Sequence, residues 1–214
     1  MLPRFSLVIP AYNEERLLPR LLDSIEVARN AYGNRDLIEV IVADNLSTDS
    51  TALIATVRKC RVVTVEKRVI AAARNGGARI ARGEIVAFID ADSQVHPQTF
   101  AEIDRALDDD RIIGGATGVH MERLSVGLAV TYALLVPFVW ITGMDTGVVF
   151  CRKQDFDAVG GYDESRVIAE DVTFLWALRR LGKARGQRLT RATRAKAIAS
   201  TRKFDEFGDW HYFP

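Results

Sequence analysis

Short apolar runs alternate with stretches of helical periodicity over the first half of the chain. The first apolar run, at residues 5–10, is followed by one helix face made of Leu18, Leu21, Leu22, Ile25 and Ala28. Further apolar runs cover residues 38–44, 62–65 and 85–90, and helical stretches cover residues 47–59, 71–81 and 97–108. This repeating strand–helix order predicts an α/β fold with a mainly parallel central sheet, right-handed crossovers and flanking helices.

The second half of the chain is less regular. Its pattern predicts strands at residues 113–119 and 147–151 and a helix at residues 170–181. The sequence contains no internal repeat, low-complexity tract or clear linker, so we expect the 214 residues to form a single domain.

Three residues predict where helices begin. Pro19 does not fit a helix interior, which places it in the first turn of the first helix. Ser47 or Thr48 is expected to cap the second helix with its hydroxyl group.

The composition is that of a folded protein with no overall charge. Hydrophobic residues make up 48% and charged residues 27%, which allows a sizeable core and excludes a disordered chain. The 29 Lys and Arg residues against 28 Asp and Glu residues give no field that attracts nucleic acid. Cys60 and Cys151 lack metal-ligand spacing and are interpreted as reduced thiols. The first residues do not have the pattern of a signal peptide, so a cytoplasmic location is expected.

Polar residues follow three of the predicted strands directly. These strand ends lie at residues 10–14, 44–49 and 90–92. Each group taken singly is compatible with helix capping. Because ligands of parallel α/β sheets bind beyond the carboxyl ends of the strands, the three groups together favour a nucleotide site.

Asp90 and Asp92 form the strongest local signal. They end an apolar strand one residue apart, and their like charges repel unless a cation lies between them. A divalent cation, Mg²⁺ or Mn²⁺, relieves this conflict and binds phosphate oxygens at its open positions. Gln94 either adds an oxygen ligand or only caps the next helix.

Six segments, in order, carry a resemblance to a known family. They are residues 8–14 (VIPAYNE), 44–51 (DNLSTDST), 74–78 (RNGGA), 83–92 (GEIVAFIDAD), 160–164 (GGYDE) and 170–171 (ED). Over residues 5–182 the sequence resembles the family 2 glycosyltransferases of the GT-A fold, including the polyprenyl-phosphate sugar transferases. The resemblance implies a nucleotide-binding half at about residues 1–95 and an acceptor-binding half at about residues 96–214. Leu46 departs from the family pattern, which often has Gly or Ala there, and this departure is expected to alter the turn without abolishing base binding.

The resemblance also implies roles for individual residues. Asp44 would bind the base, Arg74 would approach the nucleotide or diphosphate, and Asp90 would lie near the ribose. The remaining nucleotide-binding positions are Pro10, Ala11, Tyr12, Glu14 and Asn45. Asp92 would carry the metal with Asp90, and His211 from the end of the chain would complete the metal site.

Asp171 resembles the general base that takes a proton from the acceptor hydroxyl. The alternative is that Glu170 and Asp171 only favour the dipole of the helix that they open. Asp145 either binds a sugar or belongs to a turn. Beyond residue 182 the basic residues either form a solvated face or, in the case of Arg202 and Lys203, hold phosphate groups.

Residues 125–144 contain no charged side chain and are long enough to cross a membrane. We reject a span because motifs of one site lie on both sides of the segment, and Pro137 disfavours a straight helix. Two interpretations remain, a buried core segment or an interfacial segment beside a lipid-linked acceptor at the inner face of the membrane.

The sequence as a whole predicts an inverting glycosyltransferase that uses a nucleotide-diphosphate sugar. Two alternatives remain open, a sugar nucleotidyltransferase and a nucleotide-sugar-binding module without catalysis. A nucleotidyltransferase is disfavoured because residues 10–14 contain no glycine for a phosphate loop. The donor sugar, its base, the acceptor (a sugar or a lipid-linked group) and the oligomeric state are not specified by the sequence.

Overall fold

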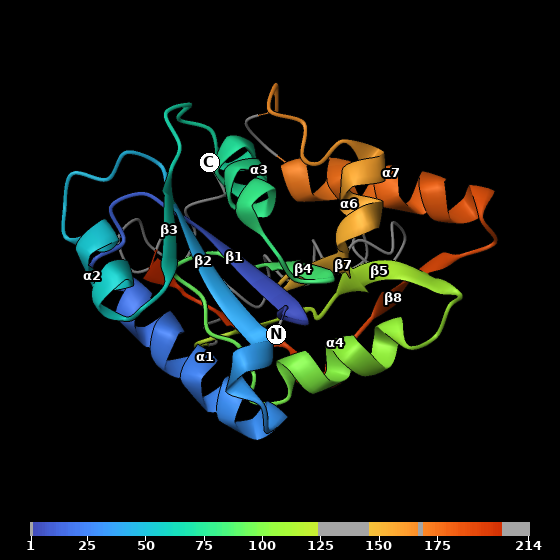
Figure 1. The fold of residues 1–214 in the computed structure, drawn as a ribbon, viewed down its shortest axis with the longest axis horizontal. Coiled ribbons are helices and arrows are strands. Elements are labelled where there is room, and N and C mark those ends of the chain that lie inside the picture. Colours follow the sequence, from blue (N-terminus) through green and yellow to red (C-terminus); the bar gives the residue numbers. More distant parts are fainter. Residues whose placement is uncertain (1, 124–145, 167–168, 203–214) are drawn as a thin grey trace.

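A seven-stranded sheet forms the centre of the computed structural model, which describes residues 2–123, 146–166 and 169–202. The strand order is β3-β2-β1-β4-β7-β5-β8 (Figure 1). The strands are β1 (Phe5–Ala11), β2 (Ile38–Asp44), β3 (Arg61–Thr64), β4 (Ile85–Phe88), β5 (Ile112–Ala116), β7 (Val149–Arg152) and β8 (Arg188–Arg191).

The sheet is mainly parallel, as the sequence predicts. Strands β3, β2, β1 and β4 run parallel to one another, and β8 is parallel to β5. Only β7 runs against its two neighbours, β4 and β5, among the described strands of this sheet. The carboxyl ends of β1, β2 and β4 therefore lie at one edge, which brings their polar residues together.

Helices cover both faces of the sheet (Figure 1). One face packs against α1 (Leu18–Tyr32), α2 (Thr51–Val57) and α4 (Thr99–Leu107) in a core that includes Leu7, Leu21 and Phe100. The other face packs against α3 (Ile70–Ile80), α6 (Lys153–Val159) and α7 (Glu170–Ala184) in a core that includes Phe88 and Phe174. Burial on both faces explains why the central strands β1, β2 and β4 are mostly apolar rather than alternating.

A second, two-stranded sheet corrects one sequence prediction. The strand expected at residues 113–119 ends at Ala116, and Val119 already belongs to β6 (Val119–Met121), which pairs with β9 (Ala197–Ala199). The chain turns between these strands at Gly118, whose φ of 80° is accessible to glycine without strain. Because β9 also forms a two-residue bridge between Ile198 and Gln94, residues near 200 lie beside the segment that follows β4.

Helix beginnings agree with the predictions in one case and differ in another. Pro19 lies in the first turn of α1, as expected. Helix α2 begins only at Thr51, so the prediction that Ser47 or Thr48 caps it is wrong. These two residues instead join the loop after β2 to the loop after β1, since Ser47 Oγ accepts from the backbone N–H of Asn13 at 3.0 Å. The amide N–H of Thr48 donates to Asn13 Oδ1 at 2.8 Å.

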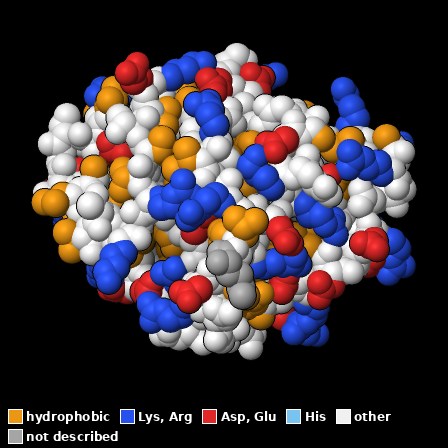
Figure 2. Space-filling model, in the orientation of Figure 1, with side chains coloured by type: hydrophobic (Ala, Val, Ile, Leu, Met, Phe, Trp, Pro, Cys, Tyr) orange, Lys and Arg blue, Asp and Glu red, His pale blue; other side chains and the backbone are white. Residues whose placement is uncertain are grey.

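Cys60 and Cys151 are both free thiols, in agreement with the sequence. On the face shown in Figure 2, Lys and Arg side chains are interspersed with Asp and Glu side chains, which fits the near-zero net charge. Within the described ranges, no helix is both long and apolar enough to cross a membrane. Residues 125–144, Asp145, Lys203 and His211 lie outside the described residues.

Candidate functional site

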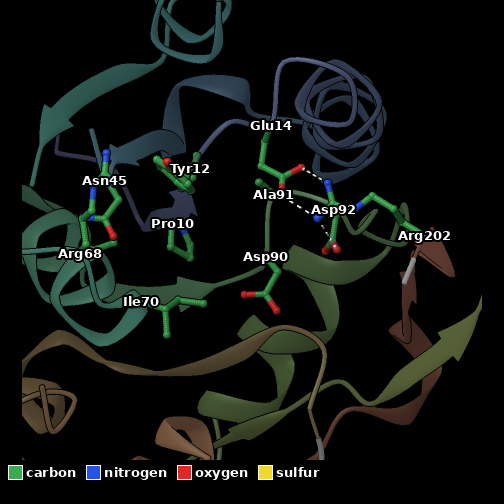
Figure 3. Close-up of a pocket in the computed structure, with 12 residues that line it drawn as sticks. Pro10, Tyr12, Glu14, Asn45, Arg68, Ile70, Asp90, Ala91, Asp92 and Arg202 are labelled. Carbon is green, nitrogen blue, oxygen red and sulfur yellow. Dashed lines mark hydrogen bonds and ion pairs between the residues drawn. The ribbon is translucent and has the colours of Figure 1, made fainter. Parts of the chain in front are cut away.

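A cavity of about 430 Å³ opens at the carboxyl ends of β1, β2 and β4 (Figure 3). We call it the strand-end cavity. Its lining residues are Pro10, Ala11, Tyr12, Glu14, Asn45, Arg68, Ile70, Ala73, Asp90, Ala91, Asp92 and Arg202. Seven of the nucleotide-binding and metal-ligating positions expected from the sequence are among them: Pro10, Ala11, Tyr12, Glu14, Asn45, Asp90 and Asp92.

One end of the cavity presents an aromatic ring. Tyr12 is 45% exposed, and the guanidinium carbon of Arg68 lies 5.0 Å from its ring centroid. Figure 3 shows both side chains, with Pro10 and Asn45, at the end of the cavity opposite to Asp92. A flat, half-exposed ring of this kind offers a stacking surface to a nucleobase.

Asn45 and Asp44 shape the wall behind this ring. The amide nitrogen of Asn45 donates to the carbonyl oxygens of Val65 and Lys67 at 2.7 and 2.8 Å, which fixes the segment after β3. Asp44 is buried at the end of β2, with its two carboxylate oxygens 3.4 Å from the backbone nitrogen of Ser47. It is not among the lining residues, so its contact with a base stays a prediction.

The turn after β2 contains a strained residue. Leu46 has a φ of 63°, in the left-handed region that glycine enters freely and that costs a bulky residue about 1–2 kcal/mol. The same position is the one at which the sequence departs from the family pattern of Gly or Ala. The cross-links from Ser47 and Thr48 to Asn13 hold the turn in place despite this strain.

Acidic side chains gather at the other end of the cavity. Asp90, Asp92 and Glu14 surround this end, and Arg202 binds Glu14 through both terminal nitrogens at 2.9 Å (Figure 3). Arg202 also lies 3.7 Å from Asp92. Burial raises the pKa of Asp92, the carboxylates of Asp90 and Glu14 raise it further, and Arg202 opposes them. The charge of Arg202 therefore does not cancel the upward shift of the Asp92 pKa.

This donor set fits a divalent cation of the Mg²⁺ or Mn²⁺ type. Such cations commonly take one or two protein carboxylates together with phosphate oxygens and water. Asp90 and Asp92 would supply the two carboxylates, and within the described residues no group of three or more His, Cys, Asp and Glu side chains is arranged to hold a metal. The expected third ligand, His211, lies outside the described residues.

A buried arginine lies next to Asp90. Arg74, on α3, is 2% exposed, and its Nη2 donates to Asp90 Oδ1 at 2.8 Å. Its Nη1 donates to Glu170 Oε1 at 2.6 Å and lies 3.0 Å from Asp171 Oδ1. The guanidinium packs over the buried ring of Tyr162, 5.1 Å from the centroid. Arg74 is not a lining residue of the cavity, so the contact with the nucleotide that the resemblance implies stays a prediction.

Asp171 has the properties of a proton acceptor. Burial raises its pKa to about 6; Arg74 opposes this shift, and the carboxylates of Asp90 and Glu170 add to it. A hydrogen bond from Tyr162 also lowers this pKa, but by less than burial raises it. The residue that precedes α7 is Ala169, which has no side-chain acceptor, and Asp171 lies inside the first turn rather than at the cap position.

Several site residues were not found by sequence reasoning. Ile70 and Ala73 look like ordinary core positions of an Ala-rich helix, and Arg68 lies in a loop without a pattern. Tyr162 belongs to the GGYDE segment, but nothing in the sequence shows that its ring supports Arg74. For Arg202 the sequence left two roles open, a solvated basic face or phosphate binding. The structure places Arg202 in the lining of the cavity, where it binds the carboxylate of Glu14.

Comparison with known proteins agrees with this architecture. The chain belongs to glycosyl transferase family 2, which it matches over residues 6–159. Relatives include the putative glycosyltransferase EpsH of Bacillus subtilis, 32% identical over 113 residues, which are 50% of this chain and 31% of that protein. Another relative is the validoxylamine A glucosyltransferase of Streptomyces hygroscopicus subsp. limoneus, 36% identical over 102 residues, which are 45% of this chain and 22% of that protein.

Solved structures of GT-A glycosyltransferases share the fold. S. aureus TarS in complex with UDP gives a TM-score of 0.71 at 20% identity, covering 96% of this chain and 63% of that one. Glucosyl-3-phosphoglycerate synthase from Mycobacterium tuberculosis, in complex with Mn²⁺, UDP-glucose and phosphoglyceric acid, gives 0.68 at 20% identity, covering 98% and 76%. By contrast, the chain spans about a third or less of the length of the two relatives compared by sequence, EpsH and the validoxylamine A glucosyltransferase.

Proposed function

We propose that this protein is an inverting glycosyltransferase that moves a sugar from a nucleotide-diphosphate donor to a hydroxyl or phosphate group of an acceptor. The observation that carries the proposal is the strand-end cavity, with a stacking surface at one end and paired aspartates at the other. A nucleoside fits the aromatic end, and a diphosphate reaches the acidic end when a divalent cation accompanies it.

The reaction needs one group that takes the proton from the attacking hydroxyl of the acceptor substrate. With a hydroxyl acceptor, Asp171 takes the proton, the hydroxyl oxygen forms a bond to the anomeric carbon, and the bond from that carbon to the diphosphate oxygen breaks. Attack opposite to the leaving group inverts the anomeric centre. A pKa of about 6 leaves Asp171 mostly ionised at neutral pH while keeping it a stronger base than an ordinary aspartate.

Asp90 and Asp92 would hold the divalent cation, which supplies charge neutralisation for the departing diphosphate. Mn²⁺ accompanies the nucleotide sugar in the related structures of a Pyrobaculum calidifontis mannosyltransferase with GDP-Man and of the Mycobacterium tuberculosis synthase, which supports this assignment. Arg202, which binds Glu14 at the acidic end of the cavity, would contact the diphosphate there.

The alternative enzyme class, a sugar nucleotidyltransferase, requires a phosphate-binding loop for the triphosphate at the end of the first strand. Residues 11–14 here cross-link to the loop after β2 through Asn13 and contain no glycine, which favours the transferase. For the acceptor, a sugar and a lipid-linked group both stay within the proposal. Contact with a membrane surface through residues 125–144 also stays a prediction.

Thermal shift with a panel of nucleotide sugars, with and without Mn²⁺ or Mg²⁺, tests the donor site first. A ligand at about 100 times its dissociation constant adds roughly 2.7 kcal/mol to the free energy of unfolding. A hydrolysis or transfer assay with the stabilising donor then separates an enzyme from a binding module. Stabilisation by no nucleotide sugar under any metal condition would contradict the proposal.

A further inference from the structure

The guanidinium of Arg74 joins the two sides of the proposed reaction. One terminal nitrogen binds Asp90, which lines the strand-end cavity, and the other contacts Glu170 and Asp171 at the start of α7. These three carboxylates come from the end of β4 and from a helix about 80 residues later in the chain. Among the described residues, Arg74 is the cation that contacts both groups.

The surroundings of Arg74 fix its position without involving the donor. Its side chain is 3% exposed and packs over the ring of Tyr162, so it has little freedom to swing toward the cavity. A planar guanidinium can bind two groups along different edges, whereas a lysine ammonium is a single point charge. The arrangement therefore requires arginine in particular, because Nη2 binds Asp90 while Nη1 faces both Glu170 and Asp171.

Asp171 takes its orientation from this arginine together with Tyr162. The carboxylate contacts Arg74 at 3.0 Å through Oδ1, and the Tyr162 hydroxyl donates to the same carboxylate from the ring that supports Arg74. The residue before α7 is an alanine in the left-handed region, which supplies no side-chain oxygen to tie down the first turn. Glu170, which binds the same Arg74 nitrogen at 2.6 Å, attaches that turn to α3.

We propose that Arg74 is a positioning residue that holds the base Asp171 in register with Asp90 at the diphosphate end of the donor cavity. This inference rests on the proposed transferase function and differs from the direct nucleotide contact that the family resemblance implies. Arg74→Lys then lowers turnover, because lysine cannot bind both sides, and leaves nucleotide affinity nearly unchanged, because it keeps the positive charge beside Asp90 and Arg74 does not itself line the cavity.

The test compares Arg74→Lys with Arg61→Lys. Arg61 is a matched control because it binds a buried carboxylate, Glu39, at 2.8 Å and a backbone carbonyl, that of Ile80, at 2.7 Å, away from the strand-end cavity. Calorimetry measures the affinity for UDP and GDP with Mn²⁺, and steady-state kinetics with the donor found by thermal shift give kcat and KM. We expect Arg74→Lys to lower kcat about 10²-fold, the loss typical of a reacting group misplaced by about 1 Å, with nucleotide affinity within about threefold of wild type. Arg61→Lys is expected to leave both constants unchanged.

The other possible outcomes refute either the positioning role of Arg74 or the transferase proposal. A kcat of Arg74→Lys within threefold of wild type refutes the positioning role, and loss of nucleotide affinity in that variant supports direct contact with the donor instead. Equal loss of kcat in Arg61→Lys shows only a general effect on the fold and also refutes it. If Arg74→Lys does not fold, Glu170→Gln takes its place, since it removes the anchor of Arg74 on α7, and unchanged kcat there overturns the inference. A wild-type protein that binds nucleotide sugars but turns over none refutes the transferase proposal itself, and the inference falls with it.

Discussion

Replacement of Asp171 by asparagine is expected to make the protein more stable and less active at the same time. One guanidinium, that of Arg74, is shared by three carboxylates, so the cluster carries excess negative charge. Burial and this excess charge raise the pKa of Asp171 from its ordinary value of 3.8 to about 6. At 1.36 kcal/mol for each pH unit of difference, the ionised carboxylate costs the folded protein about 3 kcal/mol.

The pH at which this cost applies follows from the direction of the shift. Well below pH 3.8 the carboxyl is protonated in both the folded and the unfolded chain, and at pH 4 the effect of Asp171→Asn on stability is still small. Between pH 3.8 and about 6 the unfolded chain releases this proton while the folded protein keeps it, so wild type loses stability across this window that the variant keeps. At pH 8 the variant is therefore expected to be more stable by about 2–3 kcal/mol. The gain does not exceed about 3 kcal/mol, because the amide of asparagine loses the ionic contact with Arg74.

Urea unfolding at pH 4 and pH 8, together with turnover, measures both effects. Turnover is expected to fall about 10²–10⁴-fold, because asparagine cannot accept the proton. Asp155→Asn is a matched control, since Asp155 is also buried in the first turn of a helix but binds Arg185 at 2.7 Å. That variant is expected to lose stability and to keep its activity. If Asp171→Asn instead loses stability at pH 8 and keeps its turnover, Asp171 is a structural helix-terminus residue, and the reasoning about the base is wrong.

Three further predictions follow from the site. Asp92→Ala is expected to abolish the Mn²⁺ dependence of nucleotide-diphosphate affinity, measured by calorimetry with and without the metal; equal, metal-independent affinity in both proteins would contradict a role for Asp92 in metal binding. Leu46→Asn is expected to stabilise the protein by about 0.5–1 kcal/mol, because asparagine tolerates the left-handed backbone at φ 63°; a lower urea midpoint than wild type would show that the Leu46 side chain contributes more than its strain costs. The acid side of the pH profile of kcat/KM is expected to fall with a midpoint near pH 6, because protonation removes the base, and a profile that stays flat down to pH 4 would exclude Asp171 as that base.

Much of the fold was predictable because apolar patterns mark buried strands directly. The strands that flank the cavity, β1, β2 and β4, and the paired aspartates after β4 follow from local sequence. Helix α6 was missed because its seven residues are too few for a helical period to show. The break between β5 and β6 depends on the left-handed conformation of Gly118, which a continuous run of small and apolar residues conceals.

Side-chain partners were harder to predict than strands. The RNGGA segment indicated that Arg74 belongs to the site. The contacts of Arg74 with three carboxylates, however, depend on how α3, β4 and α7 meet, which no local pattern encodes. Ser47 and Thr48 have the chemistry of helix caps, and only the approach of the loop after β1 gives them Asn13 as a partner instead. Residue types therefore indicated the kind of site, whereas the specific pairs required the three-dimensional arrangement.

The bond between Arg202 and Glu14 has a consequence for biosynthesis. These two residues are separated by 188 positions along the chain, and β9 brings them together through its bridge to Gln94. During translation the amino-terminal strands can pair early, but Glu14 meets its partner Arg202 only after the segment around residue 200 has left the ribosome. The nascent chain would therefore complete the strand-end cavity late, and a ribosome-bound chain stalled before residue 197 should retain the early strands while the cavity lacks its Arg202 side.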